Sequence, residues 1–235
     1  MPNEIATTED FEFAALAEAK NYRAALLRDF RQYLRGNVLE VGSGIGQITA
    51  ELLRSPGIEK VVSIEPDPAF CAQLRTRLPG HELVQGSVAD LRSEVRWNAI
   101  LSINVLEHIE SDVDELSTYY RLLQPSRGSL CLFVPARPEI YAPIDRDFGH
   151  FRRYTRTELI EKLQRAGFSI RSLRYYNLVG YFLWWLNFRV MKQRSFNVAS
   201  VRLFDRAIFP VIHGFENRIC APPIGQSLQV VAVAE

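Results

Sequence analysis

The sequence predicts an α/β fold in which helices cover both faces of a mostly parallel sheet. Short runs rich in β-forming residues alternate with helical patterns along nearly the whole chain. A glycine-rich turn follows the first of these runs and leads into a helix, as at the ligand-binding edge of parallel sheets. The 235 residues, 47% of them hydrophobic, can form one sizeable core. We therefore expect a single domain over residues 1–235.

Seven segments are predicted as strands because β-branched and apolar residues dominate them and turn residues bound them. The N-terminal segment 1–35, which contains a helix-forming stretch at 11–34, precedes the first strand. From there strands and helical stretches alternate, as parallel crossover units require. The predicted strands cover residues 38–41, 60–65, 82–85, 98–103, 129–134, 169–175 and 227–234.

Apolar spacing and capping residues predict the helices between the strands. Segments 45–53 and 68–78 follow the first two strands, and Ser111 is placed to cap a third helix. Thr155 is placed to cap a fourth, which ends at Gly167. The helix after Ser111 has one apolar face, formed by Val113, Leu116, Tyr120 and Leu123.

Residues 177–226 form an insertion of about 50 residues between the last two strands, where a bare fold of this kind needs only a hairpin. Its apolar run at 175–192 is shorter than the roughly 20 residues needed to cross a bilayer. The run has four aromatic residues that can wall an apolar pocket, lie in a membrane interface, pack on a partner subunit or form the core of a helical cap. They are Phe182, Trp184, Trp185 and Phe188.

The overall charge excludes a general attraction to nucleic acid or to anionic membranes. The chain has 28 basic and 27 acidic residues and a formal net charge of +1, so any anion specificity must be local. Cys71, Cys131 and Cys220 are odd in number and widely spaced, which predicts neither a disulfide framework nor a metal site. The start of the chain has no basic segment followed by an apolar one, so we expect a cytoplasmic protein.

The glycine turn lies in the stretch VLEVGSGIGQIT. Gly42, Gly44 and Gly46 permit a tight turn and close approach of the backbone to a ligand. Their G-x-G-x-G spacing differs from the G-x-G-x-x-G of dinucleotide sites, whose third glycine is replaced here by Gln47. The turn therefore disfavours a pyrophosphate ligand.

Two acidic residues flank this turn in the predicted sheet. Glu65 ends the second strand, 23 residues after Gly42, where a carboxylate can accept hydrogen bonds from both ribose hydroxyls of an adenosine. Glu40 lies inside the first strand and needs a polar partner there, such as an ammonium group of the ligand.

Five segments together resemble the class I S-adenosylmethionine-dependent methyltransferases, in particular a bacterial small-molecule branch. They are NYRAALLRDFRQYLRGNVLEVGSGIGQIT, SIEPD, INVLEHIESD, YRLLQPSRGSLCLFVPA and DFGHFRRYTRTELIEKLQRAGF, in the family's order. The resemblance implies a Rossmann-like, seven-stranded sheet whose last strand inserts antiparallel beside the sixth. One departure is LQPSRGSL, where the family usually has Leu-Lys-Pro-Gly-Gly, and we expect only a changed loop.

The resemblance also implies that S-adenosyl-L-methionine is the cofactor, with its methionine part against the glycine turn and its ribose on Glu65. In the family an acid after the third strand reaches the adenine amine; here Ser87 stands at that position and Asp90 three residues later. Either residue fits the adenine contact. The residues expected at the cofactor are Tyr22, Glu40, Gly42, Ser43, Gly44, Gly46, Glu65, Pro66, Ser87, Val88, Asn104 and Val105.

The chemistry is expected beyond the carboxyl ends of the strands, where INVLEHIE leaves the fourth strand. For a hydroxyl acceptor a base must remove the proton, and an imidazole with an ordinary pKa of about 6.5 can do so near neutral pH. His108 is therefore the candidate catalytic residue. The alternative is that His108 only caps a helix or bonds a backbone carbonyl.

The stretch YAPIDRDFGHFRRYT follows the fifth strand and mixes arginines, aspartates and aromatic residues. Its arginines can bind an acceptor's carboxylate or phosphate, or pair with Asp145 and Asp147 and fasten the loop. His150 is a second base or a member of that network. We expect no metal at Asp145, Asp147 and His150, because a hydrogen-bonded loop explains them. The residues expected at the acceptor are Tyr141, His150, Arg152, Arg153, Trp184 and Trp185.

The sequence therefore predicts transfer of a methyl group to a small-molecule or lipid-like acceptor that is amphipathic or anionic, with oxygen as the expected acceptor atom. A nicotinamide-dependent oxidoreductase is one alternative, although the glycine spacing and Glu40 disfavour it. A non-catalytic cofactor-binding partner protein is another. Peripheral membrane contact and a homodimer are compatible with the sequence, and nucleic acid is not an expected partner. The identity of the acceptor stays open.

Overall fold

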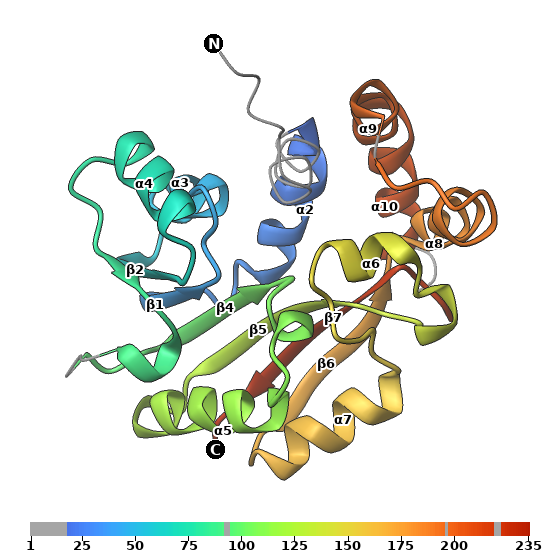
Figure 1. The fold of residues 1–235 in the computed structure, drawn as a ribbon. Helices are drawn as coiled ribbons and strands as arrows, with labels where there is room; N and C mark the ends of the chain where they lie inside the picture. The colour runs from blue at the N-terminus through green and yellow to red at the C-terminus, as the bar shows by residue number, and fades with distance from the viewer. Residues whose placement is uncertain (1–17, 92–94, 196, 219–221) are drawn as a thin grey trace.

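In the computed structural model, described for residues 18–91, 95–195, 197–218 and 222–235, helices lie on both faces of a seven-stranded sheet (Figure 1). The strand order is β3-β2-β1-β4-β5-β7-β6, and β7 runs antiparallel to both of its neighbours. The sheet and its antiparallel last strand are therefore confirmed. The strands are β1 (Gly36–Val41), β2 (Ile58–Glu65), β3 (Leu83–Gln85), β4 (Ala99–Ile103), β5 (Ser129–Pro135), β6 (Ser169–Tyr176) and β7 (Ser227–Val233).

The predicted strands agree with the observed ones to within about two residues. The helices are α2 (Lys20–Phe30), α3 (Gln47–Leu52), α4 (Pro68–Arg77), α5 (Asp112–Leu123), α6 (Pro143–Asp147), α7 (Arg156–Arg165), α8 (Leu178–Trp184), α9 (Val198–Leu203) and α10 (Phe209–Arg218). The 3₁₀ turns are η1 (Val88–Asp90), η2 (Leu106–His108), η3 (Gln124–Ser126) and η4 (Pro138–Ile140), and the π-helical segments are η5 (Trp185–Val190) and η6 (Phe204–Ile208).

The sheet is buried on both faces because successive strand residues point to opposite sides. Leu39 in β1 belongs to the cluster that includes apolar residues of α5 and α7, such as Leu116 and Leu159. Val38, one residue earlier, belongs to the cluster of α2 and the opposite face, which includes Phe30. One apolar strand thus anchors two helical layers, and its carboxyl end is held rigidly between them.

Local details differ from the prediction at two helix starts. The helix predicted at 45–53 begins at Gln47 because Gly44 and Gly46 adopt positive φ values of 53° and 79°. Ser111 occupies the N-cap position of α5, but its side chain makes no capping hydrogen bond; its backbone carbonyl accepts from Asp114 instead. The Thr155 cap is confirmed, since its hydroxyl accepts from the Glu158 amide at 3.2 Å.

Two other expectations fall partly outside the described residues. Of the N-terminal segment, the structure describes α2 but not residues 1–17, so the start of the predicted helix at 11–34 is not covered. Cys71 and Cys131 are free and buried, and Cys220 lies outside the described residues.

Residues 177–226 contain α8, η5, α9, η6 and α10, which lie at one end of the sheet beyond β6 and β7 (Figure 1). We call the helices of this segment the cap. Asn177 and Gln226 join its two ends by a side-chain hydrogen bond of 2.9 Å. Asp205 in η6 accepts hydrogen bonds from the backbone amides of Asn21 and Tyr22. It thereby satisfies amides at the N-terminus of α2, where the preceding residue makes no side-chain hydrogen bond. No helix in the described parts of the chain combines the length and the apolar character that crossing a membrane requires.

Candidate active site

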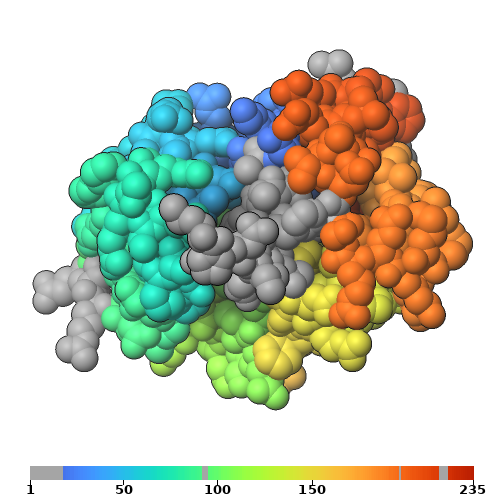
Figure 2. Space-filling model, turned by 45° about the horizontal axis from the view of Figure 1, so that its top comes forward, coloured from blue at the N-terminus to red at the C-terminus, as the bar shows by residue number. Residues whose placement is uncertain are grey.

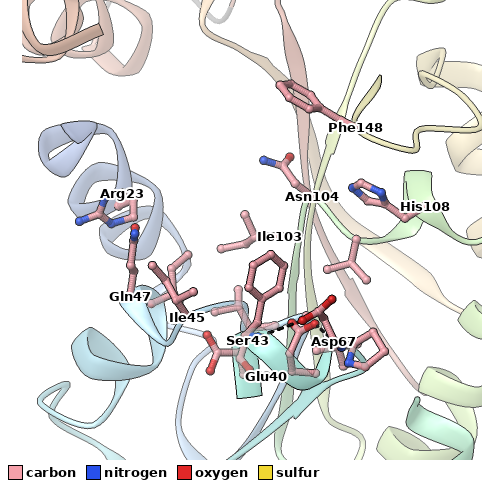
Figure 3. A pocket seen from close by; sticks show the side chains of 18 of the residues that line it. Arg23, Glu40, Ser43, Ile45, Gln47, Asp67, Ile103, Asn104, His108 and Phe148 are labelled. Carbon is pink, nitrogen blue, oxygen red and sulfur yellow. Dashed lines mark hydrogen bonds between the residues drawn. The ribbon is translucent and has the colours of Figure 1, made fainter. Parts of the chain in front are cut away.

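A first cavity of about 550 Å³ opens at the carboxyl ends of β1, β2 and β4 (Figure 3). Glu40, Ser43 and Asp67 lie at one end of it, and Asn104, His108 and Phe148 lie at the other. The structure brings together here the following residues that the sequence singles out: Tyr22, Glu40, Gly42, Ser43, Glu65, Pro66, Asn104, Val105 and His108.

The glycine turn forms one wall of this cavity. Gly42 has φ 73°, and a Cβ atom there would lie 2.2 Å from Cγ2 of Val105, so only glycine fits. The Gly42 and Ser43 amides donate to the Ile64 carbonyl at 2.9 and 3.1 Å, which ties the turn to the end of β2. The Ser43 hydroxyl is buried and has no hydrogen-bond partner among the described residues. A ligand in the cavity can satisfy it.

Glu65 links the two turns that border the cavity. One carboxylate oxygen accepts from the Gly44 amide at 2.7 Å and the other from the Asp67 amide at 3.0 Å. Because a carboxylate oxygen has two lone pairs, each can accept a further hydrogen bond from a ligand. Gly44 and Gly46 do not line the cavity; Gly44 acts through this bond to Glu65.

Glu40 is almost fully buried beneath the turn. Thr49 and Ser63 donate their hydroxyl protons to the same carboxylate oxygen at 2.6 and 2.7 Å. Burial, assisted by the nearby negative charge of Glu65, outweighs these hydrogen bonds and raises the pKa of Glu40 to about 7. The polar partners that Glu40 needs inside the strand are therefore the hydroxyls of Thr49 and Ser63. A bound cation would shift Glu40 toward its ionised form.

A second cavity of about 450 Å³ adjoins the first and shares Tyr22, Asn104 and Phe148 with it. The cap, the ends of β5 and β7, and the loop around His150 surround it. Among the predicted acceptor residues it brings together His150, Arg153 and Trp184. Its lining is mixed: polar His150 and Arg153 lie with apolar cap residues such as Leu183 and Phe188, and the cap also contributes polar residues such as Asn187 and Ser200.

His150 and Arg153 are held by one aspartate. The Arg153 guanidinium bonds Asp145 Oδ1 through Nε at 2.8 Å and through its terminal nitrogen at 2.7 Å, and Nδ1 of His150 lies 3.2 Å from the same oxygen. Burial opposes ionisation of Asp145, but the bonds from His150 and Arg153 lower its pKa below the ordinary value. Nε2 of His150 is buried without a hydrogen-bond partner among the described residues. It is the ring nitrogen that a ligand can reach.

His108 stands where the two cavities meet. Its ring lies edge-on to the ring of His150, with centroids 4.6 Å apart. The ring is open to solvent in the cleft, yet the surrounding protein mass and the positive charge of a protonated His150 lower its pKa to about 4. At neutral pH the imidazole is therefore uncharged and able to accept a proton.

His108 also belongs to a group of three side chains with the spacing of metal ligands. One ligand atom each of Glu107, His108 and His150 lies within 4.8 Å of the others. This spacing is compatible with a cation as well as with proton transfer. Asp147 forms an ion pair with Arg194, and Asp145 bonds Nδ1 of His150.

Besides Gly44 and Gly46, five predicted site residues line neither cavity. The Ser87 amide and hydroxyl both donate to Asp90 at 2.8 Å, and Val88 belongs to the core. Arg152 pairs with Asp112 at 2.7 Å, which is the loop-fastening alternative. Tyr141 donates its hydroxyl proton to the His150 carbonyl at 2.7 Å, and Trp185 lies on the outer surface of the cap with 46% of its area exposed.

The sequence did not identify several residues that the cavities contain. Phe148 lies between both cavities, although only its place in an aromatic loop was noted from the sequence. Phe70 from α4 lines the first cavity, and Asn177, with φ 63°, lines the second. The positive φ of Asn177 has a local signal, an asparagine at the end of a strand, but the position of Phe148 depends on tertiary packing.

Comparison with known proteins identifies the family. Residues 15–173 match the family described as "Methyltransferase domain". A probable S-adenosylmethionine-dependent methyltransferase of Mycolicibacterium smegmatis is 27% identical over 146 residues, which are 58% of this chain and 53% of that protein. Polyamine aminopropyltransferase 1 of Streptomyces coelicolor is 35% identical over 86 residues, 37% of this chain and 16% of that protein. The chain thus spans about half or less of the curated relatives it matches.

Solved structures share the fold at low sequence identity. A chain solved in complex with the Trm112 methyltransferase activator of Haloferax volcanii has a TM-score of 0.62 and 14% identity over 97% of each chain. The 1,6-didemethyltoxoflavin-N1-methyltransferase of Burkholderia thailandensis, solved with S-adenosylhomocysteine, has a TM-score of 0.59 and 20% identity over 93% of this chain and 80% of that one. With the family match over residues 15–173 and the seven-stranded fold, this chain belongs to the class I S-adenosylmethionine-dependent methyltransferases.

Proposed function

We propose that the protein transfers the methyl group of S-adenosylmethionine to a hydroxyl oxygen of a small amphipathic or lipid-like acceptor. The observation that carries the proposal is the pair of adjoining cavities, which share Tyr22, Asn104 and Phe148. One cavity has the glycine turn and Glu65, and the other has polar groups such as His150 and Arg153 together with side chains of the cap. Two reactants held in adjoining cavities need little further ordering to react.

The first cavity fits the family's cofactor on three observations. Its turn excludes any side chain at Gly42, its buried Ser43 hydroxyl has no hydrogen-bond partner among the described residues, and the Gly44 and Asp67 amides hold its Glu65 carboxylate at the end of β2. We assign the ribose hydroxyls to Glu65 and the methionine part to the turn above Glu40. When bound, the cofactor supplies a methyl group that positive sulfur has already activated.

His108 is proposed to accept the proton of the acceptor hydroxyl. It is uncharged at neutral pH and lies at the junction of the cavities, next to His150. His150 is a positioning group in this proposal, because Asp145 and Arg153 fix its ring while Nε2 stays available. General-base assistance of this type contributes about 10² to 10⁴ in rate.

The second cavity supports an acceptor with a polar head and an apolar body. Its lining contains Glu107, His150 and Arg153, which offer polar groups, together with apolar cap residues such as Leu183 and Phe188. Because Asp145 already neutralises Arg153, the lining favours a hydroxylated head over a strongly anionic one. The acceptor contacts are thus assigned to His150, Arg153 and Trp184.

Binding and transfer can be tested separately on the purified protein. Calorimetry is expected to show S-adenosylmethionine and S-adenosylhomocysteine competing for one site, with no binding of NAD. A labelled methyl donor is then offered to alcohols of increasing apolar length and to the matching methyl ethers, and only the alcohols should become labelled. Tight NAD binding would support an oxidoreductase instead. Cofactor binding without transfer to any alcohol would contradict oxygen methylation and favour a non-catalytic role.

A further inference from the structure

The outer surface of the cap is unusually apolar. Of the twelve exposed large hydrophobic side chains in the described residues, ten belong to the cap, so the exposure is not scattered over the molecule. Figure 2 shows the cap, in orange, along one side of the protein. The ten residues are Phe182, Leu183, Trp185, Leu186, Val190, Met191, Leu203, Ile208, Val211 and Phe215.

Helical spacing places many of these residues on continuous outer faces. Phe182, Leu186 and Val190 recur every four residues along α8 and η5, and Ile208, Val211 and Phe215 recur along η6 and α10. The inner faces of the same helices are already used for packing, by buried residues such as Trp184 and Phe209. The outer apolar faces are therefore additional to those that hold the cap on the sheet.

The charges on the cap are distributed unevenly. Arg189, Lys192 and Arg206 are exposed, whereas the acidic residues of the described segment 177–216 are turned inward. Asp205 accepts from the α2 backbone, and Glu216 accepts from the Leu178 amide at 2.8 Å. Exposed positive charge thus lies beside exposed apolar residues in the cap, although the whole chain has a formal net charge of only +1.

We propose that this outer surface of the cap docks on an anionic lipid bilayer. Helices with Trp, Phe and Leu on one face and exposed Arg and Lys beside them are typical of segments that lie in the membrane interface. A second copy of the chain is a poorer occupant, because a symmetric contact would bring the same positive charges together. A bilayer that contains anionic lipids complements both the apolar area and the charge.

Docking would place the mouth of the second cavity near the bilayer. Leu183 is exposed on the cap and also lines that cavity, and α8, η5, α9 and η6 form its wall. If the proposed methyl transfer holds, the acceptor is a bilayer lipid or a lipid-linked molecule. Membrane docking itself does not depend on that reaction.

The full-length protein is tested by sedimentation with vesicles of phosphatidylcholine alone or mixed with phosphatidylglycerol. Binding is expected with the anionic vesicles and should weaken as salt is added. Trp185 is the reporter, since it is 46% exposed while Trp97 and Trp184 are 1% and 7% exposed. Its emission should shift to the blue, and its quenching by iodide should fall, when anionic vesicles are added.

Variants of the cap, compared with control variants at the end of α3, show which surface binds the vesicles. Arg189→Gln is expected to weaken vesicle binding about fivefold, the effect of one basic residue near an anionic surface. Phe215→Ser should weaken it by at least as much. Leu53→Ser and Arg54→Gln are matched controls, because both residues are exposed at the end of α3 and should leave binding unchanged.

Calorimetry with S-adenosylhomocysteine on the same variants keeps the two proposals distinguishable. Intact cofactor binding together with lost vesicle binding supports docking through the cap. The docking proposal is overturned if the protein ignores both vesicle types, if cap and control variants bind equally, or if light scattering shows a dimer that shields Trp185 without lipid. None of these outcomes affects the assignment of the cofactor cavity.

Discussion

The two cavities are built in different ways. The first cavity, proposed for the cofactor, is formed mainly by turns at the ends of adjacent strands, and its key contacts join β1 to β2, as from Gly44 to Glu65. The second cavity, proposed for the acceptor, is assembled from α2, the loop at His150 and the cap, which are distant in the chain. The first is thus a property of the parallel sheet itself, whereas the second is a property of what is inserted into it. This difference explains why one fold can keep its cofactor and change its acceptor.

The largest expected effect concerns His108, where the two regions meet. His108→Ala should lower the single-turnover methyl-transfer rate by about 10²- to 10⁴-fold, while calorimetry shows unchanged affinity for S-adenosylhomocysteine. A rate within a few-fold of wild type would assign His108 a structural role and leave the acceptor cavity without a base.

The pH dependence of kcat/KM tests the lowered pKa of His108. Because the surrounding protein mass and the neighbouring His150 lower the pKa of His108 to about 4, its base form is complete at neutral pH. The kcat/KM profile should therefore show no inflection near 6.5 and should fall only as the pH drops toward 4. The folded-state pKa lies below the unfolded one, so the stability linked to His108 is present above 6.5 and is lost as the pH falls from 6.5 to 4. An inflection at 6.5 that disappears in His108→Ala would contradict the shifted pKa.

Substitution of Arg153 tests whether the second cavity depends on the ion pair between Arg153 and Asp145. Arg153→Met removes the guanidinium partner of buried Asp145 and leaves it, among the described residues, only His150 and the Ala142 amide, which should lower the free energy of unfolding by about 3 to 5 kcal/mol in urea denaturation. Arg152→Met is the control, because Asp112 keeps Lys162 and Tyr154 as partners and the loss should stay near 1 kcal/mol. If Arg153→Met instead spares stability and raises KM only for anionic acceptors, Arg153 binds an anionic head, which contradicts the proposed hydroxylated one.

Substitution of Glu65 tests the proposed contact with the ribose of the cofactor. Glu65→Ala should weaken S-adenosylhomocysteine binding by about 1 to 3 kcal/mol, because hydrogen bonds to a charged group are removed. Glu65→Gln, which keeps one acceptor oxygen, should lose less. Glu82→Ala removes an exposed carboxylate that pairs with Lys60 and should change nothing. Equal affinities for all four proteins would mean that the ribose lies elsewhere.

Glu40 should make cofactor binding release protons. With a folded-state pKa of about 7, raised by burial, Glu40 is partly protonated at pH 7, and a cationic ligand favours its ionised form. The calorimetric enthalpy should therefore depend on the buffer's ionisation enthalpy at pH 7 but not at higher pH. The same raised pKa means that Glu40 contributes stability below pH 4.5, which is lost as the pH rises to 7. Glu40→Gln should abolish both dependences.

The smallest expected effect is that of chelation. We expect no metal requirement, so EDTA should leave the methyl-transfer rate unchanged. Loss of activity that Mg²⁺ or Mn²⁺ restores would contradict this and would assign the cation to Glu107, His108 and His150.

The sequence by itself determined the sheet and much of the cofactor cavity. Strand composition, the G-x-G-x-G spacing and the acid 23 residues after Gly42 are local signals, because the turn and the end of β2 lie side by side in any parallel pair. Ser87 and Asp90 show the limit of this reasoning: the family resemblance left the adenine contact open between them, and in the structure they bond each other and line neither cavity.

Only the tertiary structure decided the acceptor side. Asp205 caps α2 from 184 residues away, and Phe148 comes to border both cavities, although no local pattern encodes either contact. Trp184 and Trp185 are neighbours with the same chemistry, yet one is 7% exposed and lines the cavity while the other is 46% exposed. Successive residues of a helix point about 100° apart, so the packing of α8 on the sheet, and not the residue type, decides which tryptophan faces inward.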